Sequence, residues 1–323
     1  MAGYVIGVDL GGTKILTVLA NLQGEIIAKK RSATKSEQGA EKVIDRILTT
    51  IDQVLADSDL TIDEIEAIGV GAPGPLSVKE GIIHHAPNLG WKDLNLKQLL
   101  ESELNIPVFI ENDANTAALG SKWFGAGKDK QNMIYLTVST GIGSGIIIDN
   151  KLYHGISDSA GEVGHMVLDP ESDVRCRCGD YGCWEALASG TALGRLGQKA
   201  VSSSSYSLME ELVDSTDQID GAVVTEAAAQ GDKTAKKILN QVTNYLGIGI
   251  ANLLNILNPE LIVVGGGVSQ AGDIVLEPVR EIALKRAMET PAKEVEIVRT
   301  QLGDNIGAIG AVAKALTQLG ILN

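Results

Sequence analysis

Short apolar runs separated by tight turns open the chain. Apolar residues fill most of positions 4–8 and 15–20, and a mixed run follows at 25–30. Only a few residues connect each run to the next, whereas parallel strands need a crossover of a dozen or more residues. The pattern therefore predicts three strands in an antiparallel meander.

A helical pattern follows the third run. Four apolar residues are spaced four apart, as on one face of a helix: Val43, Ile47, Ile51 and Leu55. The next patterns predict a strand, a helix and a strand at 67–70, 96–104 and 108–110. Strands and helices in this order are typical of a layered α/β domain.

The strand and Gly-rich turn of the first residues recur in the middle of the chain. A predicted strand at 133–138 runs into the Gly-rich segment 139–145, and a second strand follows at 146–149. The same succession of elements surrounds residue 9. This recurrence suggests two related halves.

Loops and helices dominate the rest of the chain. The sequence of residues 155–183 predicts an irregular insertion. The following region is predicted to be mostly helical up to Leu257, and Pro259 ends this helical pattern. Ser202–Ser205 is predicted to be a surface loop between helices. The C-terminal part predicts two strands and a final helix at 261–264, 295–298 and 304–319.

The length of the chain predicts its number of domains, and its charge limits the kinds of molecule that it is expected to bind. A chain of 323 residues predicts about two domains. The formal net charge is −14, so the surface repels phosphate backbones and anionic lipid at long range. We expect neither nucleic acid nor a membrane as a partner, although backbone N–H groups can still bind a phosphate locally. The absence of a spanning apolar run and the few cysteines predict a cytoplasmic protein.

Three Gly-rich turns follow apolar strands, at Asp9–Lys14, Thr140–Gly145 and Gly265–Val268. Glycines let the backbone approach a ligand and present N–H groups to phosphate oxygens, and the third turn would admit a flat nucleotide base. Asp9 would repel a phosphate unless Mg²⁺ lay between them. The alternative is that these segments are only tight hairpin turns.

The segment Glu111–Asn115 joins a predicted strand to a predicted helix. Asp113 there has two possible roles. It can cap the helix, which is a common role for Asp. It can also accept a proton from a substrate hydroxyl, because open α/β sheets bind ligands at the carboxyl ends of their strands.

A compact group of metal-ligand types lies in the predicted insertion. Cys176, Cys178 and Cys183 with His165 would form a closed Cys₃His zinc site, in which zinc is structural. The alternative is three reduced thiols and an unrelated His. Carboxylate and amide side chains near these motifs are the types that bind sugar hydroxyls, or else are ordinary solvated groups: Asn88, Asn112, Glu162 and Glu185.

Taken together, these motifs resemble the ROK family of bacterial sugar kinases, and within it the glucokinases. The resemblance covers nearly the whole chain. Its further motifs are Gly71–Pro75, Asn88–Trp91, Gly161–His165 and the cysteine segment with Trp184-Glu185. It implies an α/β, two-lobed actin-like ATPase or ribonuclease H-like fold, with ATP and sugar bound in the interlobe cleft. The expected domains are 1–111 with 303–323, and 112–302 with a zinc-binding loop at 165–183.

The resemblance also implies an activity, phosphorylation of D-glucose at the 6-hydroxyl by ATP with Mg²⁺, and Asp113 as the general base. It assigns the sugar to Asn88, Asn112, Asp113, Glu162, His165 and Glu185. It assigns the ATP phosphates to Asp9, Gly11, Gly12, Thr13, Lys14, Thr140, Gly141 and Gly143, and the adenosine to Gly265, Gly266 and Gly267. It assigns structural zinc to His165, Cys176, Cys178 and Cys183. The implied assembly is a homodimer or a tetramer.

Other functions remain open within and outside the kinases. The acceptor could be mannose, fructose or N-acetylmannosamine. The chain could be a sugar-sensing regulator without catalysis, but the family's repressors carry an N-terminal DNA-binding helix-turn-helix, and here the first predicted strand starts at Tyr4. A non-catalytic actin-like assembly protein is a third class. ATP is the expected donor, because polyphosphate-using relatives generally lack the zinc motif.

Overall fold

The computed structural model describes residues 3–203 and 207–323, and the chain forms two compact units. The first unit comprises Met1–Gln131, Gly145–Gly161 and Gln301–Asn323, and the second comprises Asn132–Ser144 and Glu162–Thr300. The sequence predicted that the first segment of the first domain ends at residue 111. The structure instead keeps α3 (Asp113–Phe124) in the first unit, because α3 packs closely along α11 (Ile306–Gln318). A Cβ atom at Gly310 would overlap the Thr116 carbonyl.

A five-stranded sheet forms the centre of the first unit, in the order β3-β2-β1-β4-β8. Its strands are β1 (Tyr4–Leu10), β2 (Lys14–Asn21), β3 (Ile26–Ala33), β4 (Ile65–Ala72) and β8 (Val108–Asn112). β1, β2 and β3 pair antiparallel, which confirms the predicted meander, and β4 and β8 continue the sheet in parallel with β1.

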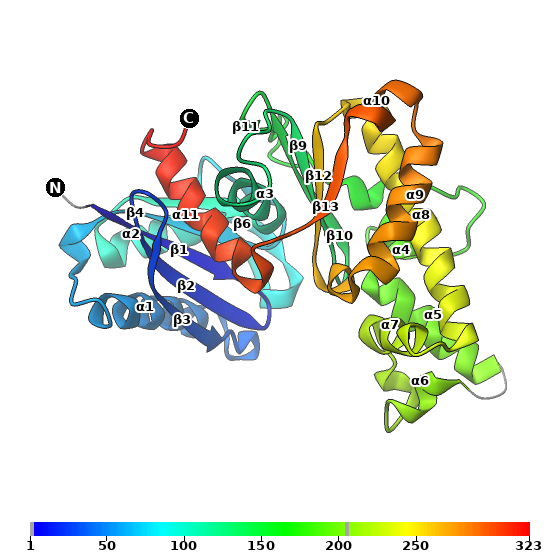
Figure 1. The fold of residues 1–323 in the computed structure, drawn as a ribbon. Coiled ribbons are helices and arrows are strands. Elements are labelled where there is room, and N and C mark those ends of the chain that lie inside the picture. The colour runs from blue at the N-terminus through cyan, green and yellow to red at the C-terminus, as the bar shows by residue number, and fades with distance from the viewer. Residues whose placement is uncertain (1–2, 204–206) are drawn as a thin grey trace. The chain divides into compact units, whose positions relative to one another are not determined.

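The two faces of this sheet carry separate apolar cores. Ile6, Val8 and Leu10 of β1 pack with residues of α1 (Ala40–Ala56), whereas Val5 packs with residues of α11. This division follows from the alternation of side chains along a strand. Figure 1 shows α1 and α11 on opposite faces of the sheet.

A small three-stranded sheet lies between β4 and β8 in the sequence and was not predicted. It consists of β5 (Leu76–Ser77), β6 (Ile82–Ala86) and β7 (Trp91–Asn95), and it leads into α2 (Leu96–Leu104). These strands are two to five residues long, and β6 contains the exposed pair His84-His85, so they lack a clear apolar alternation. Short 3₁₀ segments precede β4, β7 and α1 at Ile62–Glu64, Pro87–Leu89 and Ser36–Gln38.

The second five-stranded sheet repeats the strand order of the first. Its order is β11-β10-β9-β12-β13, with β9 (Met133–Val138), β10 (Ile142–Ile148), β11 (Lys151–Leu152), β12 (Leu261–Gly265) and β13 (Glu296–Arg299). As in the first sheet, the two later strands run parallel to the first strand, β9. This shared topology supports the suggestion of two related halves.

β10 begins earlier than the sequence predicted, at Ile142 rather than residue 146. Gly143 and Gly145 therefore lie in a strand and not in a turn. Close packing explains a glycine there, since a Cβ atom at Gly145 would lie 2.5 Å from Ala118 Cβ and 2.8 Å from the Ala114 carbonyl oxygen.

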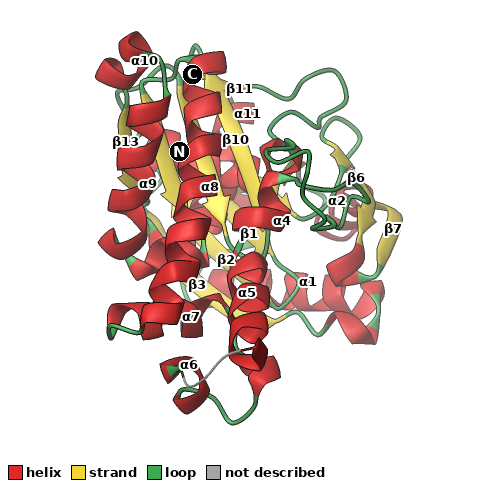
Figure 2. Ribbon diagram, turned by 90° about the vertical axis from the view of Figure 1, so that its right-hand side faces the viewer, coloured by secondary structure: helices red, strands yellow, loops and turns green. Residues whose placement is uncertain are grey.

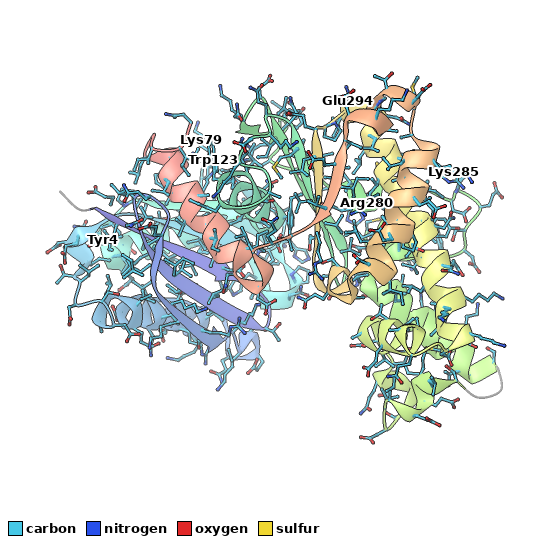
Figure 3. The ribbon with its side chains drawn as sticks, in the orientation of Figure 1. Tyr4, Lys79, Trp123, Arg280, Lys285 and Glu294 are labelled. Atoms are coloured by element: carbon cyan, nitrogen blue, oxygen red, sulfur yellow. The ribbon has the colours of Figure 1, made fainter. Side chains whose placement is uncertain are left out.

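Helices pack against the second sheet, and the chain is mostly helical up to Leu257, as expected. They are α4 (Trp184–Ala188), α5 (Gly190–Ser203), α6 (Leu208–Glu211), α7 (Gly221–Ala229), α8 (Lys233–Leu257), α9 (Asp273–Arg286) and α10 (Glu289–Glu294). Figure 2 shows α8 and α9 among the helices that cover this sheet. Arg280 of α9, labelled in Figure 3, donates to the Ile297 carbonyl of β13 from Nε and Nη2 at 3.1 and 2.9 Å.

Two predictions about loops have different outcomes. The region 155–183 is irregular as predicted, with a 3₁₀ turn at Val163–His165 and two isolated bridges. Of the predicted loop Ser202–Ser205, the first two residues belong to α5, and the rest lies outside the described residues. No helix in the described part of the chain is both long enough and apolar enough to cross a membrane.

Candidate active site and metal centre

Polar side chains gather at the carboxyl edge of the first sheet. Asp9, Gly71 and Glu111 lie in register across β1, β4 and β8, which run parallel. β8 then ends at Asn112, and Asp113 begins α3. Ligands of open α/β sheets bind at this type of edge, so the fold gives Asp9, Asn112 and Asp113 a common setting.

The geometry of the β8–α3 junction distinguishes between the two roles predicted for Asp113. Asn112 is the N-cap of α3, because its Oδ1 accepts the N–H groups of Ala114 and Asn115 at 2.9 and 3.4 Å. Asp113 is instead the first helical residue, and the cap hypothesis for it was wrong. Its side chain is exposed, and its Oδ1 accepts the Ala114 N–H at 2.8 Å. A helix N-terminus favours a charged carboxylate, which can accept a proton.

Asp9 is a half-buried carboxylate at the end of β1. It lies against the start of α11, where a Cβ atom at Gly307 would be 2.5 to 2.7 Å from its carboxyl atoms. Burial and then the negative charge of Asp113 raise the pKa of Asp9 to about 6, although Lys14 acts in the opposite direction. A cation beside the Asp9 carboxylate would relieve this repulsion, and Mg²⁺ prefers such oxygen ligands. The residues therefore fit a Mg²⁺ ion that is bound with phosphate.

The first Gly-rich turn is held by backbone and hydroxyl hydrogen bonds. Gly11 N–H donates to the Lys14 carbonyl at 2.9 Å, and the Thr34 hydroxyl donates to the Gly11 carbonyl at 2.6 Å. Gly12 lies close to Asn88, since a Cβ atom at Gly12 would be 3.0 Å from Asn88 Cβ. The structure thus brings Asn88, which is exposed, beside the turn predicted to bind phosphate.

Asp9→Asn is expected to stabilise the ligand-free protein at neutral pH by up to about 3 kcal/mol. The pKa of Asp9 rises from 3.8 to about 6 on folding, so the fold favours the neutral carboxyl. That contribution is complete below pH 3.8 and is lost as the pH rises through 6, whereas Asn has no such titration. Urea unfolding curves without Mg²⁺ should show the advantage of the variant growing between these pH values. A constant difference from pH 4 to pH 8 would contradict the assignment.

The second unit contains a pocket of about 750 Å³ beside the second and third Gly-rich turns. Thr140 and Gly267, which the sequence predicted to bind nucleotide, are among the residues that line it. Thr191, Arg195 and Gln198 of α5 line it as well, and sequence reasoning missed them. The glycines of α5 were an available signal, because α5 packs tightly on its neighbours. A Cβ atom at Gly194 would contact the residues just before α7, and one at Gly197 would contact Ile219 and, in α7, Val224.

Glu185 holds the second Gly-rich turn. Its Oε2 accepts the Ile142 N–H at 3.0 Å, and a Cβ atom at Gly141 would overlap the same oxygen. Thr191 Oγ1 donates to the Thr140 carbonyl at 2.7 Å. Glu185 was predicted as a sugar ligand, and the structure shows a direct bond from it to the turn predicted to bind phosphate.

The three glycines of the third turn differ in their surroundings. A Cβ atom at Gly265 would overlap the Tyr135 hydroxyl, and Gly266 has a φ of 84° next to the Val138 backbone. These two glycines are explained by packing within the second unit. Gly267 is exposed and lines the pocket, so it is the one of the three with open access to a ligand there.

The predicted zinc ligands lie together in the second unit. The ligand atoms of His165, Cys176, Cys178 and Cys183 are all within 4.8 Å of one another. Cys178 Sγ is 3.7 Å from Cys183 Sγ, and Cys176 Sγ is 3.5 Å from His165 Nδ1. A tetrahedral zinc ion places two sulfurs about 3.8 Å apart, and a sulfur and a nitrogen about 3.5 Å apart. The donor set and its spacing therefore fit zinc.

His165 presents its two ring nitrogens in different directions. Nδ1 faces Cys176, whereas Nε2 is 3.8 Å from Glu162 Oε2. A neutral imidazole that binds a metal through Nδ1 carries its proton on Nε2. Burial and then the neighbouring thiols raise the pKa of Cys183 to about 12, and a bound cation would reverse this by favouring the thiolates.

The predicted site residues thus divide between the two units. Asp9, the first turn, Asn88, Asn112 and Asp113 belong to the first unit. The second unit contains the rest: residues 140–144 of the second turn, the third turn, the pocket, Glu162, His165, Glu185 and the cysteines.

The chain is similar to known proteins over almost its whole length. The sequence profile of the ROK family matches residues 5–318. A glucokinase of Halalkalibacterium halodurans is 38% identical over 307 residues, which cover 95% of this chain and 93% of that protein. A xylose repressor of Caldicellulosiruptor bescii is 34% identical, with 98% of this chain and 79% of the repressor covered.

Solved structures agree with the sequence matches. A ROK family glucokinase from Streptomyces griseus, crystallised with glucose and AMPPNP, has a TM-score of 0.84 and 36% identity, and the match covers 98% of this chain and 100% of that one. This likeness confirms the expected actin-like α/β fold. The chain belongs to the ROK family.

Proposed function

We propose that this chain is a sugar kinase that transfers a phosphoryl group from ATP to the 6-hydroxyl of D-glucose. Its similarity to glucokinases, one of them crystallised with glucose and AMPPNP, supports this activity. The observation that carries the proposal is the pair Asp9 and Asp113 at one sheet edge. Asp113 is exposed at a helix N-terminus, and its charge helps to raise the pKa of the half-buried Asp9 to about 6.

The two carboxylates have different tasks in this proposal. Asp113 accepts the proton of the 6-hydroxyl as the oxygen attacks the terminal phosphorus of ATP in line with the leaving group. Asp9 would hold Mg²⁺, which offsets the charge of the phosphate oxygens. Backbone N–H groups of the Asp9–Lys14 turn and of residues 140–143, where β10 begins, would bind phosphate oxygens. The pocket lined by Arg195, Gln198 and Gly267 takes the adenosine.

The remaining polar groups bind the sugar hydroxyls. Asn112 uses its Oδ1 as the helix cap, so its NH₂ group is the part that donates to a hydroxyl. Asn88, Glu162 and Glu185 provide further oxygen and amide contacts. His165 would donate from Nε2 to the sugar, and a zinc ion held by the three cysteines and His165 Nδ1 would fix the orientation of the ring. Zinc at this site would be structural, because four protein ligands would leave no open position for water.

A coupled ADP-release assay with Mg-ATP and a panel of hexoses tests this function. We expect turnover that requires sugar, with the highest kcat/KM for D-glucose and lower values for mannose, fructose and N-acetylmannosamine. A higher kcat/KM for another hexose would show that this hexose, and not D-glucose, is the preferred acceptor. Turnover with none of the four sugars would refute the kinase activity. Light scattering tests the homodimer or tetramer that the resemblance implies.

A sugar-sensing regulator is the second candidate function. The observation that favours it is 34% identity to a xylose repressor over 98% of this chain. A regulator of this kind would bind xylose without ADP release and would shift an operator fragment in a gel. The formal net charge of −14 opposes DNA binding by this chain.

A further inference from the structure

A fully buried carboxylate lies immediately before the proposed base. Glu111 is the penultimate residue of β8 and has no exposed surface. Its Oε1 accepts the Asn112 backbone N–H at 3.1 Å and the Asn115 side-chain amide at 3.0 Å. Its Oε2 accepts from Lys314 Nζ at 2.8 Å and lies 2.9 Å from His154 Nε2. One carboxylate thus joins the end of β8, the first turn of α3, α11 and the segment that follows β11.

The environment of Glu111 keeps it ionised. Burial by itself would raise its pKa, but the hydrogen bond with His154 and the positive charge of Lys314 outweigh burial and lower the pKa to about 2. Lys314 is itself 5% exposed. A buried ion pair is often no more stable than an apolar pair of the same volume. Stability alone therefore gives a weak reason for placing these charges beside the proposed base.

The contacts of Oε1 lie on both sides of Asp113 in the sequence. Asn112 and Asn115 flank the first turn of α3, and Glu111 binds a donor from each of them. Asn115 directs its amide to Glu111 although its own Oδ1 is then buried without a partner among the described residues. The orientation of this turn is thus fixed by Glu111, and Asp113 projects from the same turn.

The contact of Oε2 with His154 ties a distant segment to the same junction. His154 lies 43 residues after Glu111 and precedes a loop that the Ala160 N–H closes onto the His154 carbonyl at 3.0 Å. Asp158 in this loop accepts the Val78 N–H at 3.0 Å. The loop ends at Gly161, directly before Glu162 in the sequence. His154 therefore connects the start of the Gly161–His165 motif to the β8–α3 junction.

We propose that Glu111, held by Lys314 and His154, is a positioning residue for phosphoryl transfer: it fixes the first turn of α3 so that Asp113 meets the sugar hydroxyl in the reactive orientation. This proposal rests on the proposed kinase function. Glu111 touches neither sugar nor phosphate in it and acts through Asn112, Asn115 and the backbone of the turn. A displacement of about 1 Å at a reacting group can lower a rate by about 100-fold.

The first test compares two substitutions of His154, which is not assigned to the catalytic or binding machinery. His154→Ala removes the donor to Glu111 Oε2, whereas His154→Gln keeps an N–H donor of similar reach. We expect kcat with glucose to fall by between about tenfold and 100-fold in the first variant, and to be largely restored in the second, with the KM for ATP nearly unchanged. His84→Ala is the matched control, because His84 forms a surface pair with Asp93 at 3.2 Å outside this cluster.

The second test separates positioning from stability. Glu111→Gln with Lys314→Met removes both buried charges together, so that no unpaired charge opposes folding. We expect this double variant to melt near the wild-type temperature and still to have a reduced kcat. Hydrogen exchange of the ligand-free protein should be faster at the amides of 112–116 than in the wild type and unchanged in the helix α8.

The outcomes are separable from those of the kinase proposal. Absence of turnover by the wild-type protein refutes the kinase function, and hydrogen exchange then still reports whether Glu111 orders the turn. Wild-type kcat in both the His154→Ala and the double variant would overturn the proposal. Unchanged exchange at 112–116 in the double variant would overturn it as well.

Discussion

Asp113→Asn is expected to lower kcat for glucose phosphorylation by about 10² to 10⁴-fold. Asn lacks a basic oxygen that can take the proton of the 6-hydroxyl, but it keeps the size of Asp and an oxygen that can accept the Ala114 N–H. The side chain is exposed, so no buried contact is lost. We therefore expect the melting temperature and the glucose Kd to remain close to those of the wild type. Single-turnover kinetics and calorimetric titration with glucose measure these quantities.

A matched control separates the loss of the base from a general change of charge. Asp52→Asn removes an exposed carboxylate from α1, at a distance in the fold from the β8–α3 junction. It should have wild-type kcat and KM. A kcat for Asp113→Asn within threefold of the wild type would exclude Asp113 as the general base.

Removal of the zinc site is expected to have the second large effect. The purified wild-type protein should contain about one zinc ion per chain, because the structure provides one complete set of four ligands. Cys183→Ser should lose that zinc and expose residues 165–183 to limited proteolysis, since structural zinc contributes about 10 kcal/mol or more to folding of its site. The glucose KM should rise and kcat/KM should fall by more than about 100-fold, because His165 loses its metal anchor.

Arg177→Ala is the control for the zinc site. Arg177 lies between two of the ligands, is exposed and is no ligand itself. This variant should keep both zinc and activity. Elemental analysis that finds no zinc in freshly purified wild-type protein, or wild-type kinetics in zinc-free Cys183→Ser, would contradict the role given to this site.

Local apolar patterns in the sequence predicted those elements that depend mainly on residues close together in the chain. The β1–β3 meander and the helix around Val43–Leu55 follow from apolar spacing, and their observed bounds differ from the predictions by a few residues. The Cys₃His group was also predictable, since all four ligands lie within one irregular segment. The repeated strand order of the two sheets was visible only as two Gly-rich turns at similar places.

Other features depend on contacts between distant parts of the chain. Lys314 and Glu111 are 203 residues apart, and no local pattern indicates their pairing. The predicted domain boundary at residue 111 missed the packing of α3 on α11, which rests on contacts such as Gly310 against Thr116. The short strands β5–β7 lack apolar alternation. Arg195 and Gln198 occur on an ordinary amphipathic helix, so only the folded pocket distinguishes them.

The most direct test of the central claim is the identity of the phosphorylated product. Wild-type protein, Mg-ATP and D-glucose are incubated together, and ³¹P NMR follows the reaction. We predict ADP and glucose 6-phosphate in equal amounts, with no ADP when glucose is omitted. Phosphate on another hydroxyl, release of inorganic phosphate in place of a sugar phosphate, or no reaction would contradict the claim that this chain transfers the phosphoryl group of ATP to the 6-hydroxyl of glucose.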